Sequence, residues 1–230
     1  MRLAIIGYGK LGKAVGEAWK AGGGLVVARI SHGDVWEAKE LEADIVFESS
    51  TPESAAENIL ECVNAGVPVV VGTTGWHHRM GEISTAVEAQ GGLLFHATNF
   101  SIGVHLMNQF AGNMARTMKA FNDYSPSITE AHHIHKLDKP SGTAITLSEK
   151  VKASVEISEI EIESIREGEI VGMHEIVWSS EIDEISLKHE ASSRLGFALG
   201  AVKSAKWLLD KKAAGASGVF SMDNMIKEIT

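Results

Sequence analysis

The first hundred residues alternate between short, nearly continuous apolar runs and longer stretches whose apolar residues recur at helical spacing. The apolar runs predict β-strands at residues 3–6, 25–30, 43–47, 67–71 and 93–97. The stretches between them predict helices at residues 10–21, about 52–64 and about 78–89. Because each strand is apolar on both sides, the pattern predicts a parallel sheet that helices cover on both faces.

The pattern changes after about residue 103. Residues 104–120 predict a long helix with a single apolar stripe. The region 157–189 contains short runs of period two, in which Ile160 and Ile162 alternate with glutamates. This alternation is typical of antiparallel strands with one solvated face.

Residues 198–209 and 222–229 predict two further helices, and no low-complexity linker separates the parts of the chain. We therefore predict an α/β protein of two domains. The first contains a doubly wound parallel sheet, and the second is an α+β domain with a mixed or antiparallel sheet. The last helices are expected to return to the first domain.

Composition and charge narrow the classes of function. With 230 residues, of which 44% are apolar, the chain can bury a substantial core. Its formal net charge of −9 argues against nucleic acid or a membrane as the main partner, so an anionic ligand needs a local cationic site. The single cysteine, Cys62, excludes an internal disulfide and a multi-cysteine metal site. The pattern of apolar residues predicts a soluble cytoplasmic protein without a signal peptide or a membrane span.

A glycine-rich turn follows the first predicted strand and opens the first predicted helix. It reads Gly7-x-Gly9-x-x-Gly12. Glycines at this spacing permit a tight turn and let backbone N–H groups approach a pyrophosphate at the positive end of the helix. We therefore predict that the turn binds a dinucleotide. The alternative is a turn that serves only the packing of helix against sheet.

An acidic residue that binds the adenine ribose is expected at the end of the second strand. That end reads "ISHGD", residues 30–34. Since neither Ser31 nor His32 is a carboxylate, a 2′-phosphate is not repelled there, and His32 or Arg29 could contact it, which favours NADP(H). In the alternative, Asp34 turns back toward the ribose and serves NAD(H).

Two later loops carry small hydroxyl residues. "SSTPES", residues 49–54, and "GTTG", residues 72–75, each follow a predicted strand. Each loop alone is typical of a helix cap. Because ligands of parallel sheets bind at the carboxyl ends of the strands, the two loops together favour a site for the nicotinamide half of a dinucleotide.

The segment "EAHHIHKLDKPSGTA", residues 130–144, has three interpretations. His133 and His135 could share a face and bind a metal, but a metal site needs further ligands. The segment could also be a solvated polar loop. In the third interpretation it is an anion-binding acid–base site, where histidine donates a proton and Lys136 holds a carboxylate. The turn at residues 140–143 precedes a predicted helix whose positive end could bind a second carboxylate.

This segment, with the N-terminal "GYGKLG", the central "GTTG", "ATNFSIGV" and the late "ASSRLGFALGAV", resembles the 4-hydroxy-tetrahydrodipicolinate reductase (dihydrodipicolinate reductase) family. The resemblance runs nearly end to end. It implies a Rossmann-like dinucleotide-binding domain of residues 1–103 and 194–230, and a substrate-binding and oligomerisation domain of residues 104–193 that builds a homotetramer. It also implies hydride transfer from NADPH or NADH to a cyclic, imine-containing dicarboxylate in lysine and diaminopimelate biosynthesis, without a metal.

The resemblance further implies roles for single residues. His132 matches the general acid/base and Lys136 a second proton donor. His133, Gly142 and Thr143 match the substrate-carboxylate contacts, and Lys136 and Ser141 are also predicted to bind the substrate. With Ser31 and His32, the predicted cofactor contacts are Gly7, Tyr8, Gly9, Lys10, Leu11, Gly12, Gly72, Thr73, Thr74, Ala97, Thr98, Asn99 and Phe100.

Some questions stay open at this point. Family members that use NADH well often carry an acidic residue where Ser31 stands, so the cofactor preference is undecided. Two rival functions are an aldehyde-type dehydrogenase with Cys62 as nucleophile and a sensing module that binds the dinucleotide without reaction. For the reductase, residues 99–103 and 192–196 are the expected hinges.

Overall fold

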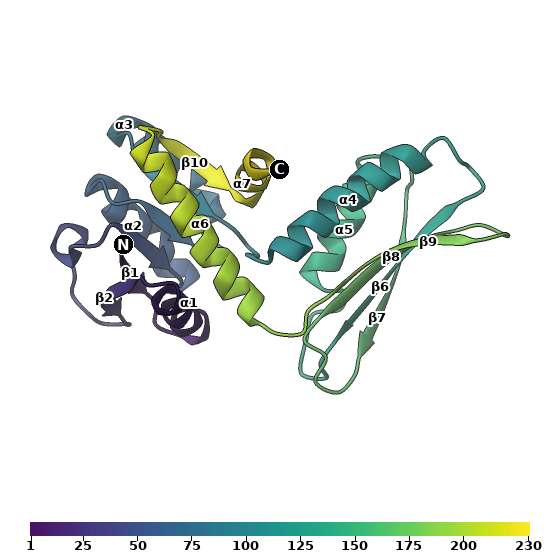
Figure 1. The fold of residues 1–230 in the computed structure, drawn as a ribbon, viewed down its shortest axis with the longest axis horizontal. Coiled ribbons are helices and arrows are strands. Elements are labelled where there is room, and N and C mark those ends of the chain that lie inside the picture. The colour runs from purple at the N-terminus through teal and green to yellow at the C-terminus, as the bar shows by residue number, and fades with distance from the viewer. The chain divides into compact units, whose positions relative to one another are not determined.

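The computed structural model describes residues 1–230. The chain forms two compact units (Figure 1). Unit 1 comprises Met1–Ser101 and Leu195–Thr230, and unit 2 comprises Ile102–Arg194. The functional roles expected for the two domains remain predictions.

Unit 1 contains a six-stranded sheet in the order β10-β5-β4-β3-β1-β2, with every pair of neighbours parallel. Its strands are β1 (Arg2–Ile6), β2 (Leu25–Ile30), β3 (Ile45–Glu48), β4 (Val69–Val71), β5 (Leu93–His96) and β10 (Gly218–Ser221). All residues of the central strands β3 and β4 are buried, because helices cover both faces. The predicted parallel sheet is thus confirmed, with β10 as an edge strand that the sequence pattern did not predict.

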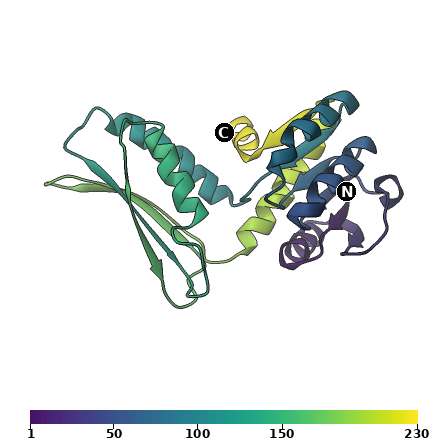
Figure 2. The same cartoon turned by 180° about the vertical axis from the view of Figure 1, so that it is seen from behind.

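The helices of unit 1 form a layer on each side of the sheet (Figures 1 and 2). They are α1 (Lys10–Ala21), η1 (Ala38–Leu41), α2 (Pro52–Asn64), η2 (His77–Arg79), α3 (Met80–Gln90), α6 (Leu195–Ala213) and α7 (Met222–Ile229). Helices α1 and α6 pack against each other, as do α2 and α3. No helix combines the length and hydrophobicity that a membrane span requires.

Unit 2 has a four-stranded sheet in the order β7-β6-β8-β9, covered by two helices. Its elements are α4 (Ile102–Met118), β6 (Ser125–His132), α5 (Gly142–Lys152), β7 (Glu161–Arg166), β8 (Met173–Ser179) and β9 (Glu184–Glu190). Helices α4 and α5 pack on one face over Ile128, Ile176 and Trp178, which are at most 2% exposed. The other face carries no helix of its own unit (Figure 1).

The second sheet is mixed. Strand β8 is antiparallel to both β6 and β9, whereas β7 is parallel to β6. The predicted mixed or antiparallel sheet is confirmed in its mixed form, whereas the antiparallel strands that the period-two pattern alone indicates are wrong for β7. The physical reason is the helix between the two strands, since a crossover through α5 returns the chain to the same end of the sheet.

Candidate active site

The glycine turn of unit 1 begins where β1 ends, and glycine suits its three positions for different reasons. Gly7 has φ +85°, and a Cβ there would lie 2.2 Å from the carbonyl oxygen of Ser49. A Cβ at Gly12 would lie 2.3 Å from the carbonyl oxygen of Gly7. Packing explains these two glycines, but no atom lies within 4 Å of a Cβ built at Gly9. Gly9 also precedes α1 without a side-chain cap, so the open space and the free N–H groups suit an incoming phosphate.

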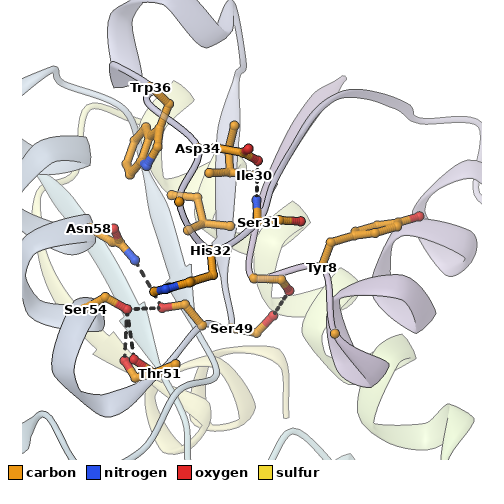
Figure 3. Close-up of a pocket in the computed structure, with 15 residues that line it drawn as sticks. Tyr8, Ile30, Ser31, His32, Asp34, Trp36, Ser49, Thr51, Ser54 and Asn58 are labelled. Carbon is orange, nitrogen blue, oxygen red and sulfur yellow. Dashed lines mark hydrogen bonds between the residues drawn. The ribbon is translucent and has the colours of Figure 1, made fainter.

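A pocket of about 480 Å³ lies beside this turn (Figure 3). Its volume is within the range that cofactor sites have. It is lined by Ile6, Gly7, Tyr8, Gly9, Ile30, Ser31, His32, Gly33, Asp34, Trp36, Ser49, Ser50, Thr51, Ser54 and Asn58. The glycine turn, the end of β2 and the loop after β3 thus meet around one cavity.

The residues predicted to distinguish a ribose with a free 2′-hydroxyl from one with a 2′-phosphate lie at the end of β2. The carboxylate of Asp34 accepts a hydrogen bond from the backbone N–H of Ser31 at 2.7 Å (Figure 3), so this carboxylate is bound within its own loop. Ser31 and His32 are exposed and line the pocket. Arg29 does not itself line the pocket, but its guanidinium lies 5.4 Å from the centre of the ring of Tyr8, which does.

A buried carboxylate that the sequence analysis overlooked organises the opposite wall. Glu48, the last residue of β3, is fully buried. Its Oε1 accepts hydrogen bonds from the backbone N–H and hydroxyl of Ser50 and from the amide of Asn58, while its Oε2 has no partner. The only sequence signal was an acidic residue that ends an otherwise apolar strand.

The loops predicted for the nicotinamide half follow neighbouring strands, because Val71 of β4 is paired with His96 of β5. In the first loop, Thr73 is buried with a hydroxyl that has no partner, and Thr74 is exposed. A buried hydroxyl without a partner suits a ligand that brings a hydrogen bond.

Three other predicted cofactor contacts pack on one another. A Cβ at Gly72 would lie 3.3 Å from side-chain atoms of both Leu11 and Phe100. The predicted residues Lys10 and Thr98 are exposed, Asn99 is half-buried and Ala97 is buried. The predicted set therefore lies along the carboxyl edge of one sheet, although Leu11 and Phe100 have a packing role as well.

The histidine-lysine segment belongs to unit 2, where β6 supplies Glu130 and His132. Both side chains lie on the same face of the sheet, since residues two apart in a strand point the same way. Oε2 of Glu130 lies 2.5 Å from Nδ1 of His132. The Glu130 side chain is 0% exposed and that of His132 is 11% exposed. His132 is thus held by a buried carboxylate.

Arg166, the last residue of β7, connects this pair to the loop that follows β6. Its guanidinium donates to Glu130 at 2.8 Å, to the carbonyl of Lys136 at 3.3 Å and to the carbonyl of Asp138 at 2.5 Å. The ammonium of Lys136 lies 2.7 Å from the carboxylate of Asp138. The sequence analysis assigned no role to Glu130 or Arg166, because their contact depends on strand pairing.

The start of α5 lies against the same carboxylate. The backbone N–H of Ser141 donates to Oε1 of Glu130 at 3.2 Å, and the Ser141 hydroxyl caps α5 by accepting the N–H of Ala144. Gly142 is exposed and Thr143 is half-buried at the first turn of the helix. This end of α5 presents N–H groups and a positive dipole that suit a carboxylate.

His133 carries a nitrogen that lacks a partner. Its Nε2 accepts a hydrogen bond from the guanidinium of Arg194 at 3.0 Å, which places the proton of the neutral ring on Nδ1. Nδ1 is buried and has no partner. A ligand carboxylate would satisfy this donor, as the predicted substrate contact requires.

His133 and His135, the residues of the metal interpretation, do not belong to a cluster of three potential ligands, although the carboxylate of Glu169 lies 3.8 Å from Nε2 of His135. The cluster of potential ligands is instead Glu130, His132 and His174, whose ligand atoms lie within 4.8 Å of one another. Its carboxylate is already held by Arg166 and His132. A cation there would have to compete with a guanidinium, so the cluster does not suit a divalent metal.

Burial and charge set the protonation of this cluster. Burial raises the pKa of Glu130, but the hydrogen bonds from Arg166, Ser164 and His132 outweigh it and hold that pKa below its ordinary value. Burial lowers the pKa of His132, and Glu130 opposes this shift. Burial, with a smaller contribution from His132, lowers the pKa of His174 to about 4. Near neutral pH, Glu130 is therefore ionised and His174 is neutral.

Comparison with protein families places the chain beside one group of reductases. The model "Dihydrodipicolinate reductase, C-terminus" matches residues 103–226, and "Dihydrodipicolinate reductase, N-terminus" matches residues 29–100. The chain is 33% identical to a 4-hydroxy-tetrahydrodipicolinate reductase of Christiangramia forsetii, over 100% of this chain and 99% of that protein. It is also 33% identical to one of Thermosipho africanus, over 99% of both chains.

Solved structures show the same fold. A dipicolinate-bound dihydrodipicolinate reductase from Paenisporosarcina sp. TG-14 has a TM-score of 0.82 over 96% of this chain and 97% of that chain, at 22% identity. A probable dehydrogenase from Thermotoga maritima has a TM-score of 0.61 over 97% and 92%, at 10% identity. The fold expected from the sequence is therefore confirmed in both units.

Proposed function

The chain belongs to the dihydrodipicolinate reductase family, and we propose that it reduces 4-hydroxy-tetrahydrodipicolinate to tetrahydrodipicolinate with NAD(P)H in lysine and diaminopimelate biosynthesis. The observation that carries the proposal is the buried Glu130–His132 pair at the base of the loop that bears Lys136. It combines a proton-transfer group with cations that suit a dicarboxylate.

The residues of the glycine turn and the sheet edge hold the cofactor in this proposal. Backbone N–H groups after Gly9 bind the pyrophosphate, and Ser31 and His32 lie at the ribose. The loops that contain Thr73 and Asn99 line the nicotinamide half. The cofactor supplies the hydride when it is bound. The open space at Gly9 and the partnerless hydroxyl of Thr73 support this fit.

We infer that NADPH is preferred over NADH. No carboxylate occupies Ser31 or His32, and the one nearby, Asp34, already accepts the N–H of Ser31. Arg29 beside the Tyr8 ring adds positive charge that suits a 2′-phosphate. The ratio of kcat/KM for the two reduced cofactors measures the preference, and a ratio that favours NADH would overturn it.

In the substrate half, the positive groups orient the two carboxylates and His132 moves a proton. Lys136, the Nδ1–H of His133 and the N–H groups of Gly142 and Thr143 bind the carboxylates. The substrate gains a hydride and a proton and loses its hydroxyl group as water. His132 donates this proton from Nε2, because its Nδ1 is occupied by Glu130.

Absorbance of NADPH, followed with and without 4-hydroxy-tetrahydrodipicolinate, tests the function. We expect oxidation of NADPH only when the substrate is present. A protein that binds NADPH but never oxidises it would instead fit the sensing module. The third candidate, a thiol dehydrogenase, is disfavoured because Cys62 is fully buried and burial raises the pKa of its thiol.

The homotetramer implied by the resemblance stays a proposal. It is supported by the sheet face of unit 2 that lies opposite α4 and α5 (Figure 1). This face carries Ser127, Thr129 and Val177, which are half-buried. Sedimentation analysis at micromolar concentration tests the proposal, and a monomer would overturn it.

A further inference from the structure

Glu130 is a buried charged residue of unit 2, and the chemistry described above uses it only as the group that occupies Nδ1 of His132. Its side chain is 0% exposed. It binds Nδ1 of His132 at 2.5 Å through one oxygen, and the guanidinium of Arg166 and the N–H of Ser141 through the other. Burying a carboxylate is costly unless it is paired and hydrogen-bonded, and here two of its contacts are with His132 and with the start of α5, where the proposed substrate contacts lie.

We propose that Glu130 is a positioning residue for the reduction: it fixes the His132 ring with Nε2 free for proton transfer and stabilises the protonated form of that ring. Arg166 keeps Glu130 ionised for this task. The inference rests on the proposed function, in which His132 is the proton donor, and it assigns the control of that donor to a residue that touches neither substrate nor cofactor.

Two different residues set the tautomer of the His132 ring and the access to its free nitrogen. Nδ1 can only donate to the ionised Glu130, so the neutral ring carries its proton on Nδ1. On the other side, a Cβ built at Gly172 would lie 3.2 Å from Nε2 of His132 and 3.4 Å from its Cδ2. A residue without a side chain thus lies against the free nitrogen and leaves it accessible.

The charges around the ring make Glu130 decisive for its protonation. The groups that face His132 are Glu130 on β6, Lys136 in the following loop, Arg166 on β7 and His174 on β8. The rings of His132 and His174 are 5.1 Å apart. Two of these neighbours are cations and one is a neutral imidazole, so only Glu130 favours an imidazolium at this position.

Replacing Glu130 by glutamine separates charge from shape. The amide oxygen of Glu130→Gln can still accept the Nδ1–H, so the ring keeps its place, but the negative charge is lost. We expect the pKa of His132 to fall by about one to two units, the size expected for losing a charge-assisted hydrogen bond. A proton donor works in its protonated form, so the fall of kcat/KM with rising pH moves to lower pH by the same amount.

The rates give a signature that a purely structural role would not produce. At pH values above the fall of kcat/KM in both proteins, kcat/KM of Glu130→Gln is expected to be about ten- to a hundredfold lower than that of the wild type. At pH values below both falls, the two values of kcat/KM converge. The Kd for NADPH should not change. Glu149→Gln on the exposed side of α5 makes the same chemical change without these partners and is the matched control. A loss that is equal at every pH would overturn the proposal.

Two NMR measurements on protein with isotope-labelled histidine test the inference independently of turnover. In the wild type, the nitrogen shifts of neutral His132, assigned by their loss in His132→Gln, should report the Nδ1–H tautomer. The opposite tautomer would overturn the proposal even if Glu130→Gln did not fold. An unchanged pKa of His132 in a folded Glu130→Gln would also overturn it. If the wild type never oxidises NADPH with substrate, the proposed function fails, while these measurements still decide whether Glu130 controls His132.

Discussion

Replacing Arg166 by methionine removes the counter-ion of a buried carboxylate while keeping a side chain of similar length. In the wild type, Glu130 is 0% exposed and Arg166 is 13% exposed, with 2.8 Å between guanidinium and carboxylate. Removing one partner of a buried ion pair costs about 3–5 kcal/mol. Because Glu130 keeps its hydrogen bonds with the N–H of Ser141 and with Nδ1 of His132, we expect Arg166→Met to lower the free energy of unfolding by about 3 kcal/mol, at the lower end of this range.

The loss of stability in Arg166→Met should be larger at high pH than at low pH. In the wild type the pKa of Glu130 is held below its ordinary value, so its ion pair stabilises the fold above about pH 4.3 and this stability is lost as the pH falls. Without Arg166, the largest of the contributions that oppose burial is lost and the pKa of Glu130 rises. The ionised carboxylate then destabilises the variant at high pH, and protonation relieves it. The gap between wild type and Arg166→Met should therefore be larger at pH 8 than at pH 5.

Urea titrations followed at Trp178 measure this gap within unit 2. Trp178 is the only tryptophan of Ile102–Arg194 and is 2% exposed, so its resonance in protein labelled with fluorotryptophan reports this unit alone. Lys119→Met is the matched control, since it removes a cation from an exposed pair with Glu156, which should contribute about 0–1 kcal/mol. If Arg166→Met lost no more than this control, or lost the same amount at both pH values, the reasoning would be wrong.

Three further predictions concern turnover and the cofactor. His132→Gln and Lys136→Ala should each lower kcat by roughly 10²–10⁴-fold while NADPH still binds, as steady-state rates and a binding titration will show; near-normal turnover would remove the assigned role. Gly7→Ala should destabilise unit 1 in urea by more than about 1 kcal/mol, because φ is +85° there, whereas Gly9→Ala should fold normally and bind NADPH more weakly. Equal effects of the two alanines on folding would contradict the difference in space around them. Ser31→Asp should shift the ratio of kcat/KM for the two reduced cofactors toward NADH. An unchanged ratio would show that residue 31 does not contribute to the cofactor preference.

The sequence predicted those features that depend on neighbours in the chain. The strand–turn–helix around Gly9 and the apolar strands of unit 1 are local patterns, and the structure has both. The edge strand β10 was missed because its four residues give no periodicity and it is ordered only by pairing with β5. Local patterns therefore gave the parallel sheet but not its last strand.

The partners of the acid–base residues could not be predicted in the same way. Arg166 lies beside His132 because β7 pairs with β6 in a register that places the two opposite each other. The parallel direction of β7 follows from the crossover through α5, whereas the sequence pattern alone favoured antiparallel strands. A histidine-rich segment shows that titratable groups are present, but their protonation depends on residues more than thirty positions away.

The candidate cofactor site of unit 1 and the candidate acid–base site of unit 2 share one structural feature, a buried carboxylate near the end of a strand that organises the loop that follows. Glu48 ends β3 and accepts hydrogen bonds from the N–H of Ser50 and the amide of Asn58. Glu130, near the end of β6, accepts the N–H of Ser141 and the guanidinium of Arg166. In each case the loop obtains its hydrogen bonds from the protein before a ligand arrives. Because ordering a loop opposes binding, loops arranged in advance leave more of the interaction with the ligand for affinity and for orienting the reacting groups.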